Sequence, residues 1–240
     1  IAEDKQLKTG DKVYAVWMHK MVALFQIGEE PISNGMNILG AHIDSPRLDV
    51  KQNPLYEADG FAYLDTHYYG GIKKYQWVAQ PLALHGVAVL KSGKIVPICV
   101  AAKVIEGENM DLLIGNMPLR DCKDLKEEEK ELVKANILSI LKQEYGIEED
   151  DFQSAELEIV PAGKARDLGF DRSMILGYGQ DDRICAFTSL FAMLEAENLK
   201  KTGVCLLVDK EEIGSVGATG MQSHFFENTV AELIALTEGE

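Results

Sequence analysis

The 240-residue sequence lacks several features that would place it in a specialised class of protein. It contains no low-complexity tract and no apolar run near the roughly 20 residues that a membrane helix needs. Its four cysteines, Cys99, Cys122, Cys185 and Cys205, form no C-x-x-C pair, so we interpret them as reduced residues of a cytoplasmic protein. Basic residues are scarce, with 24 Lys and Arg against 39 Asp and Glu. The net charge of −15 therefore argues against a nucleic-acid partner.

The composition is that of an ordinary globular chain. Hydrophobic residues make up 46% and charged residues 26% of the sequence, which suffices for a core in one large domain or two ordinary ones. No cationic, apolar leader stands at the N-terminus. Because the chain begins at Ile1 without a methionine, we expect further sequence upstream.

An apolar run ends abruptly in two adjacent carboxylates near residue 210. Residues 204–208, Val-Cys-Leu-Leu-Val, predict a short strand buried on both faces, as in a parallel sheet. Glu211 and Glu212 follow at its carboxyl end, where ligands bind in open α/β sheets. Taken alone, such a pair is more typical of a solvated strand end than of a site.

A second strand ends in polar side chains near residue 42. Residues 13–17 and 21–27 predict a hairpin, and the segment 37–46, Asn-Ile-Leu-Gly-Ala-His-Ile-Asp-Ser-Pro, predicts a strand after it. His42 and Asp44 lie two apart, so both point to one face of an extended segment. A carboxylate beside an imidazole is the usual orienting partner of a metal-binding histidine. The H-x-D pattern alone is as often a hydrogen-bonded structural histidine.

A third cluster opens a helix near residue 180. Asp181 and Asp182 follow Gly177 and Gly179, where the third glycine of a dinucleotide-binding fingerprint is absent. One of the two aspartates has an ordinary explanation as a helix cap. The helix leads directly to the strand at residues 204–208, which is a connection typical of a doubly wound α/β sheet. Its apolar residues share one face: Ile184, Phe187, Leu190, Phe191 and Leu194.

The sequence between the second and third clusters has a different texture. We interpret residues 52–157 as an inserted, β-rich domain that interrupts a catalytic α/β domain formed by residues 1–51 and 158–240. Residues 81–90 and 94–102 predict strands joined by a turn at 91–93. Residues 125–145 predict a long helix, with Asp124 as its N-cap and Gly146 as its stop. The Glu127–Glu129 run is typical of a solvated helix start.

The three clusters together predict a metal site. His42 with Asp44, Asp181 with Asp182, and Glu211 with Glu212 should meet at one edge of a sheet. Imidazole and carboxylate without thiolate suit zinc or a similar divalent ion, and an aspartate can bridge two metals about 3.5–4 Å apart. Of two adjacent glutamates, one can bind metal while the other accepts a proton.

The sequence resembles the aspartyl aminopeptidase family of di-zinc exopeptidases. The residues that carry the resemblance are Gly40–Pro46 (GAHIDSP), Gln180–Arg183 (QDDR) and Asp209–Ser215 (DKEEIGS), and it extends through the inserted domain. The resemblance implies a zinc-exopeptidase sheet with an oligomerisation insert, a dodecameric assembly, and release of single N-terminal residues from peptides.

The resemblance also implies a role for each matching residue. His42 would bind one zinc, Asp181 would bridge both, and Glu212 would bind the second. Glu211 would be the general base, and Asp44 would orient His42. The expected cofactors are therefore two divalent metal ions, zinc by preference.

The family pattern needs a further metal-binding Asp and a final His beyond the Glu-Glu motif. Residues 213–240 offer His224 as their one histidine, and it lies too close to the motif to match the late one. We therefore expect this chain to be a partial record of a longer enzyme. The alternative, which the missing ligands favour, is a non-catalytic assembly or binding subunit that keeps the fold.

Substrate preference is left open by the sequence. A chain of net charge −15 repels acidic peptides at long range, so selection of an acidic N-terminal residue would need a local basic group. Arg47, Lys73 and Lys74 are the candidates. No membrane partner is expected.

Overall fold

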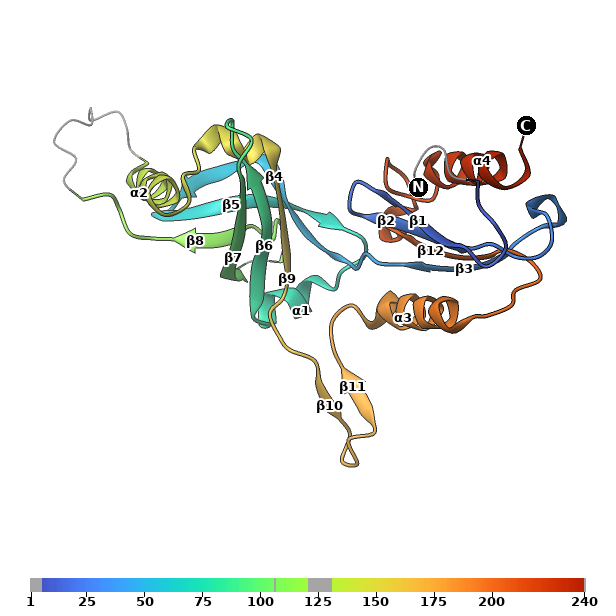
Figure 1. Cartoon of the computed structure of the whole chain (residues 1–240). Coiled ribbons are helices and arrows are strands. Elements are labelled where there is room, and N and C mark those ends of the chain that lie inside the picture. The colour runs from blue at the N-terminus through green and yellow to red at the C-terminus, as the bar shows by residue number, and fades with distance from the viewer. Residues whose placement is uncertain (1–5, 106, 121–130, 240) are drawn as a thin grey trace. The chain divides into compact units, whose positions relative to one another are not determined.

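The computed structural model describes residues 6–105, 107–120 and 131–239, which divide into two compact units (Figure 1). Unit 1 comprises Ile1–Ser45 and Tyr178–Glu240, and unit 2 comprises Pro46–Gly177. The boundaries that we expected from the sequence, after residues 51 and 157, both fall inside unit 2. The assignment of a catalytic domain and an inserted domain stays a prediction.

Unit 1 is built on a four-stranded mixed sheet in the order β1-β2-β12-β3. Its strands are β1 (Lys12–Trp17), β2 (Met21–Gln26), β3 (Asn37–His42) and β12 (Gly203–Val208). β1 and β2 form the antiparallel hairpin that the sequence predicts. β12 runs parallel to β3 but antiparallel to β2, so the expected parallel surroundings of this strand are correct on one side only.

Two helices cover opposite faces of this sheet, α3 (Gln180–Glu195) and α4 (Phe225–Glu238) (Figure 1). Successive side chains of a strand point to opposite faces, so β12 is buried from both sides, as its apolar run predicts. Val204 and Leu206 pack in one cluster with Leu233 of α4. Cys205 and Leu207 pack in another with Ala186 and Met193 of α3. The α/β class expected for this part of the chain is confirmed.

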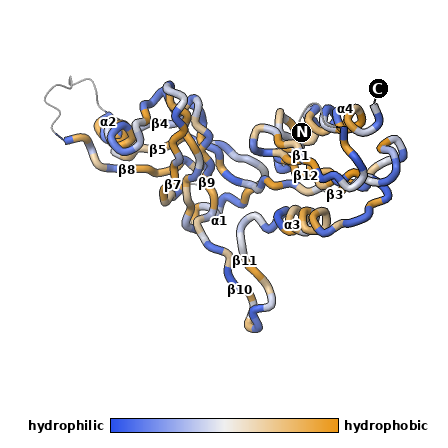
Figure 2. The backbone as a smooth tube through the Cα atoms, viewed as in Figure 1, coloured by the Kyte–Doolittle hydropathy of each residue, from blue (hydrophilic) through white to orange (hydrophobic). Residues whose placement is uncertain are grey.

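The predicted apolar face of α3 faces solvent in this structure. Ile184, Phe187, Phe191 and Leu194 are each more than half exposed, whereas the helix contacts the sheet through Ala186 and Met193. Figure 2, which colours each residue by its hydropathy, shows apolar residues along α3. The periodicity correctly predicts a helix with an apolar face, but another face of that helix packs on the sheet.

Unit 2 is a closed barrel in the order β4-β5-β8-β7-β6-β9. Each strand therefore has a neighbour on both sides, although β4 and β9 pair only at Leu48 and Asp49 of β4. The predicted hairpin of residues 81–90 and 94–102 is confirmed as the antiparallel pair β6–β7. The barrel strands are β4 (Arg47–Ala58), β5 (Phe61–Tyr69), β6 (Leu82–Val89), β7 (Ile95–Val104), β8 (Leu112–Gly115) and β9 (Ala155–Pro161).

The remaining elements of unit 2 are short. α2 (Leu132–Ile140) continues as a π-helical turn over Leu141–Tyr145 and ends at Gly146, whose left-handed φ of 73° fits the predicted stop. The helix expected over residues 125–145 does not continue through residue 131, because Glu131 has non-helical backbone angles and α2 begins at Leu132; Asp124 and Glu127–Glu129 lie outside the described residues. The others are α1 (Lys74–Ala79), a 3₁₀ turn at Glu149–Ser154, and a hairpin of β10 (Arg166–Leu168) and β11 (Met174–Leu176). Among the helices of the described ranges, none is long and apolar enough to cross a bilayer.

Candidate metal centre

The imidazole of His42 stands at the carboxyl end of β3. The parallel register of β3 with β12 pairs His42 with Val208, so the two strands end side by side. The His42 side chain is 12% exposed, and its Nδ1 lies 3.3 Å from an Asp44 carboxylate oxygen. Nδ1 lies closer, at 3.0 Å, to the Asp44 backbone carbonyl. Both acceptors favour a proton on Nδ1. The other ring nitrogen, Nε2, faces Glu211.

Glu211 and Glu212 occupy a tight turn directly after β12. Lys210 adopts a left-handed φ of 69° and starts the 3₁₀ turn Glu211–Ile213. The Thr219 hydroxyl donates a 2.7 Å hydrogen bond to the buried Asp209 carboxylate and so closes the following loop. Only glycine fits at residue 220, because a Cβ there would lie 2.1 Å from the Ser215 carbonyl oxygen. The loop geometry therefore fixes the direction in which both glutamates leave the strand.

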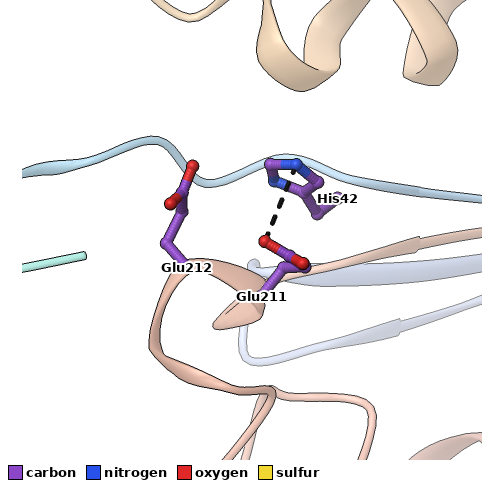
Figure 3. A group of neighbouring side chains, drawn as sticks. All are labelled: His42, Glu211 and Glu212. Carbon is purple, nitrogen blue, oxygen red and sulfur yellow. Dashed lines mark ion pairs between the residues drawn. The ribbon is translucent and has the colours of Figure 1, made fainter. Parts of the chain in front are cut away.

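The structure brings His42, Glu211 and Glu212 together (Figure 3). One ligand atom of each lies within 4.8 Å of the others. His42 Nε2 lies 3.9 Å from a Glu211 carboxylate oxygen, and the Glu211 side chain is 55% exposed. Imidazole nitrogen and carboxylate oxygen are both donor types that zinc accepts in proteins.

Asp181 approaches the same imidazole from the start of α3. Its Oδ1 lies 3.1 Å from His42 Nε2, although the side chain is 87% exposed and stands outside the three-residue cluster. Ser45 donates a hydrogen bond of 3.2 Å to the Asp181 backbone carbonyl. The helix begins at Gly179 without a side-chain cap, and Asp181 and Asp182 have non-helical backbone angles with a cis peptide between them. The cap at Gly179 involves no side chain, and the ordinary capping role considered for one of these aspartates stays a prediction.

The electrostatics of the cluster reflect an excess of carboxylates. Burial lowers the pKa of His42, but the hydrogen bonds to Asp181 and Asp44 and the nearby negative charges outweigh it and raise that pKa overall. Burial raises the pKa of Glu212, and the Asp44, Glu211 and Asp181 carboxylates raise it further against the opposing effect of His42. The surrounding carboxylates thus make Glu212 harder to ionise, and a cation at the centre would relieve that cost.

The two ring nitrogens of His42 give a more direct indication of a cation. Nδ1 faces the carbonyl and carboxylate of Asp44, and Nε2 faces the Asp181 carboxylate at 3.1 Å. A neutral imidazole carries one N–H, so it satisfies only one of these sides. Either a second proton or a positive ion must lie between Nε2 and Asp181. The residues present therefore fit a divalent ion bound at Nε2.

Comparison with known proteins matches this chain to one family along its length. The family model described as aminopeptidase I zinc metalloprotease (M18) matches residues 1–105 and 103–240. A probable M18 family aminopeptidase 1 from Clostridium acetobutylicum is 58% identical over 98% of this chain. The chain belongs to the M18 family.

Solved M18 structures agree with this assignment. Aminopeptidase I from Clostridium acetobutylicum superposes with a TM-score of 0.85 at 57% identity over 96% of this chain. An M18 aminopeptidase from Thermotoga maritima gives a TM-score of 0.88 at 40% identity over 97% of this chain. The chain covers 55% of each of these two proteins and 55% of the Clostridium sequence relative, so it spans about half the length of the relatives it matches.

The other residues considered from the sequence are not part of the cluster of His42, Glu211 and Glu212. His224 precedes α4, is largely exposed and pairs with Glu227 at 2.7 Å. Arg47 is buried in unit 2, forms ion pairs with Asp49 and Glu158, and lies over the Tyr69 ring. Two carboxylates already neutralise its guanidinium, so the suggestion that Arg47 binds acidic substrates is wrong on this geometry. Lys73 and Lys74 remain exposed.

Sequence reasoning missed two contacts within the candidate metal centre. The first is the hydrogen bond that the Ser45 hydroxyl donates to Asp181. In the second, the backbone N–H groups of Glu211 and Glu212 donate hydrogen bonds to the Asp44 carboxylate. Both join residues more than 130 positions apart, so no local pattern announces them. The one available signal was that Asp44 and Ser45 follow the predicted ligand His42 directly.

Proposed function

We propose that this chain is part of a zinc-dependent aminopeptidase that removes single N-terminal residues from peptides. The observation that carries the proposal is the convergence of His42, Glu211 and Glu212 to within 4.8 Å at the carboxyl ends of β3 and β12. The M18 relatives, which are named as aminopeptidases, support the reaction class.

The proposed roles follow the donor chemistry of each side chain. His42 binds one metal ion through Nε2, because its Nδ1 is engaged by Asp44. Asp181 would serve as the ligand shared by two ions and Glu212 as a ligand of the second, and Asp44 would orient His42. The full site holds two divalent ions, zinc by preference, and draws its remaining ligands from outside this chain.

Glu211 is the proposed general base. When bound, the metal ions polarise the scissile carbonyl and lower the pKa of a water molecule. Glu211 accepts a proton from that water at its exposed carboxylate and passes it to the departing amine. The Glu212 carboxylate is less exposed than that of Glu211, which suits a ligand, whereas an exposed Glu211 can reach both water and substrate.

The larger architecture is part of the same proposal. Unit 1 would belong to a doubly wound catalytic sheet, and the barrel of unit 2 would be the inserted oligomerisation domain. A homo-oligomer, dodecameric by family resemblance, and a cytoplasmic location are likewise proposals. For a preference toward acidic N-terminal residues, Lys73 and Lys74 are the basic candidates that remain.

The test is metal binding and peptidase activity in the longer protein that contains this chain. We expect His42→Ala to lower zinc affinity by more than the roughly 10–100-fold that loss of an orienting partner costs. We expect Glu211→Gln to retain zinc and to lower kcat on aminoacyl-p-nitroanilides by about 10²–10⁴-fold. His224→Ala is the matched control, because this exposed histidine lies outside the cluster.

The two measurements separate the alternatives. Absence of zinc binding in the unaltered protein would favour the non-catalytic assembly subunit. Normal turnover by Glu211→Gln would show that the base lies elsewhere, while the metal assignment would survive.

A further inference from the structure

The Asp44 carboxylate accepts hydrogen bonds from more than one side of the cluster. It follows β3 directly, and its side chain is 1% exposed. The Glu211 backbone N–H donates to Oδ1 at 3.3 Å, and the Glu212 N–H donates to Oδ2 at 3.2 Å. A buried carboxylate thus joins the end of β3 to the turn after β12.

His42 has a second acceptor at residue 44 besides this carboxylate. Its Nδ1 lies 3.0 Å from the Asp44 backbone carbonyl and 3.3 Å from the Asp44 carboxylate oxygen. The carbonyl is the nearer acceptor, and it remains in place whatever side chain stands at residue 44. The proton on Nδ1, and with it the availability of Nε2, is therefore secured by the backbone.

The Glu211–Glu212 turn has no such substitute. The first N–H groups of any helical turn lack partners within that turn and need an acceptor from elsewhere. Here the two N–H groups belong to the residues whose side chains face His42 (Figure 3). The orientation of both glutamates consequently depends on the position of one carboxylate.

We propose that Asp44 is a positioning residue for the Glu211–Glu212 turn and that its carboxylate holds the base and the neighbouring ligand in place. This proposal rests on the proposed function for the roles of the two glutamates. It concerns the metal-free chain, so it is tested without metal or substrate.

The experiment is amide hydrogen exchange and ¹⁵N NMR on the 240-residue chain in chelator, comparing the unaltered chain with Asp44→Asn and Ser45→Ala. Asparagine keeps the shape but presents an NH₂ group to one of the two amides, so at least one hydrogen bond is lost. We expect the Glu211 or Glu212 amide to exchange at least 10-fold faster in Asp44→Asn. We also expect their ¹H resonances to move upfield, because bonds to a charged acceptor are the stronger ones.

The controls separate positioning from general loss of structure. The β12 amides should keep their exchange rates, and His42 should keep its proton on Nδ1. Ser45→Ala removes a neighbouring buried hydroxyl that contacts Asp181, and it should leave both glutamate amides unchanged. In the unaltered chain the two amides should exchange more slowly than unstructured ones, a measurement that needs no variant to fold.

Two results would overturn the proposal: unprotected Glu211 and Glu212 amides in the unaltered chain, or unchanged amides in Asp44→Asn. If Asp44→Asn instead alters only the His42 tautomer, orientation of the imidazole is the whole role of the side chain. Loss of zinc binding or of peptidase activity in the longer protein has no bearing on these amide measurements, so the two proposals fail separately.

Discussion

The β-sheets of the two units differ in closure, although both units expose large apolar side chains, such as Ile95 and Ile175 in unit 2. The barrel of unit 2 closes on itself and encloses a cluster that includes Leu48, Leu82, Trp77 and Ile159. The sheet of unit 1 ends at β1 and β3, and it carries exposed apolar side chains on β3 and α3, among them Ile38, Phe187 and Phe191. Such exposed apolar surface is typical of contact sites.

The candidate metal centre and the closed barrel therefore lie in different units of the chain. The candidate metal centre lies at the ends of two strands of the open unit, where backbone groups and side chains are still available to a ligand. The barrel is closed in its strand order and buries Arg47 against two carboxylates. We therefore expect the barrel to tolerate changes at the metal site, and the metal site to be the more easily perturbed structure.

The largest expected effect comes from opening a cavity in the barrel. Leu48 is fully buried, so Leu48→Ala should lower the free energy of unfolding of unit 2 by about 2–5 kcal/mol. The chain has two tryptophans, Trp17 in unit 1 and Trp77 in the barrel core, so replacing either by Phe leaves a fluorescent reporter of the other unit. Urea unfolding followed by Trp77 should show the full loss.

The control for this change is Ile95→Ala, because the side chain of Ile95 is largely exposed on β7 and its removal should cost little. The transition reported by Trp17 should remain in place in both variants. A parallel shift of both transitions would mean that the units unfold as one cooperative block, and the contrast between them would be lost.

An intermediate effect is expected at the hydrogen bond between Tyr56 and Asp111 in the barrel. The Tyr56 hydroxyl donates at 2.6 Å to Asp111, which is buried, so Tyr56→Phe should cost about 1.5 kcal/mol at pH 8. Burial raises the pKa of Tyr56, and the hydrogen bond and negative charge of Asp111 raise it further. A raised pKa in the folded state means that the contribution is complete below the unfolded pKa of about 10 and is lost as pH rises through the folded value.

The stability difference between the unaltered chain and Tyr56→Phe should therefore shrink between pH 8 and pH 11. Urea titrations at the two pH values measure it, with the exposed Tyr75→Phe as the control that shows no such trend. A difference that grows with pH would have the wrong sign for a raised pKa and would reject this assignment.

These expectations rest on features that the sequence predicts to different degrees. The apolar run of residues 204–208 and the polar groups after it predict β12 and the place of Glu211 and Glu212, because the carboxyl ends of parallel strands such as β3 and β12 meet at one edge of a sheet. The antiparallel pairing of β12 with β2 could not be predicted from that run, because burial on both faces does not depend on the direction of the neighbours.

The helix at residues 180–195 shows where periodicity stops being informative. The spacing of Phe187 and Phe191 predicts a helix with an apolar face, but not which surface that face meets. The sheet contact uses the small Ala186 and the flexible Met193 instead. Nor could the sequence reveal that the Asp44 carboxylate binds the Glu211 and Glu212 amides, because that contact depends on the relative placement of two strands.

The smallest expected effect tests the exposed face of α3 itself. Phe191 stacks only on Phe187 of the same helix, with ring centroids 6.4 Å apart, and is more than half exposed. Phe191→Ser should therefore lower the free energy of unfolding seen by Trp17 by no more than the roughly 0.2–0.5 kcal/mol of such a helical pair, since Phe and Ser have similar helix propensities.

Met193→Ser is the matched control on the same helix, because Met193 is buried against the sheet and its loss should cost about 2–5 kcal/mol. The ratio between the two variants, measured by urea unfolding of the isolated 240-residue chain, reports which face of α3 is covered in solution. A loss above about 1 kcal/mol for Phe191→Ser would place that face in contact with other protein surface even in this chain, because an exposed side chain has too few neighbours to account for it. In that case the apolar face of α3 would be covered, as the barrel core is. The loop after β12, rather than uncovered surface on unit 1, would then account for the exposure of the candidate metal centre.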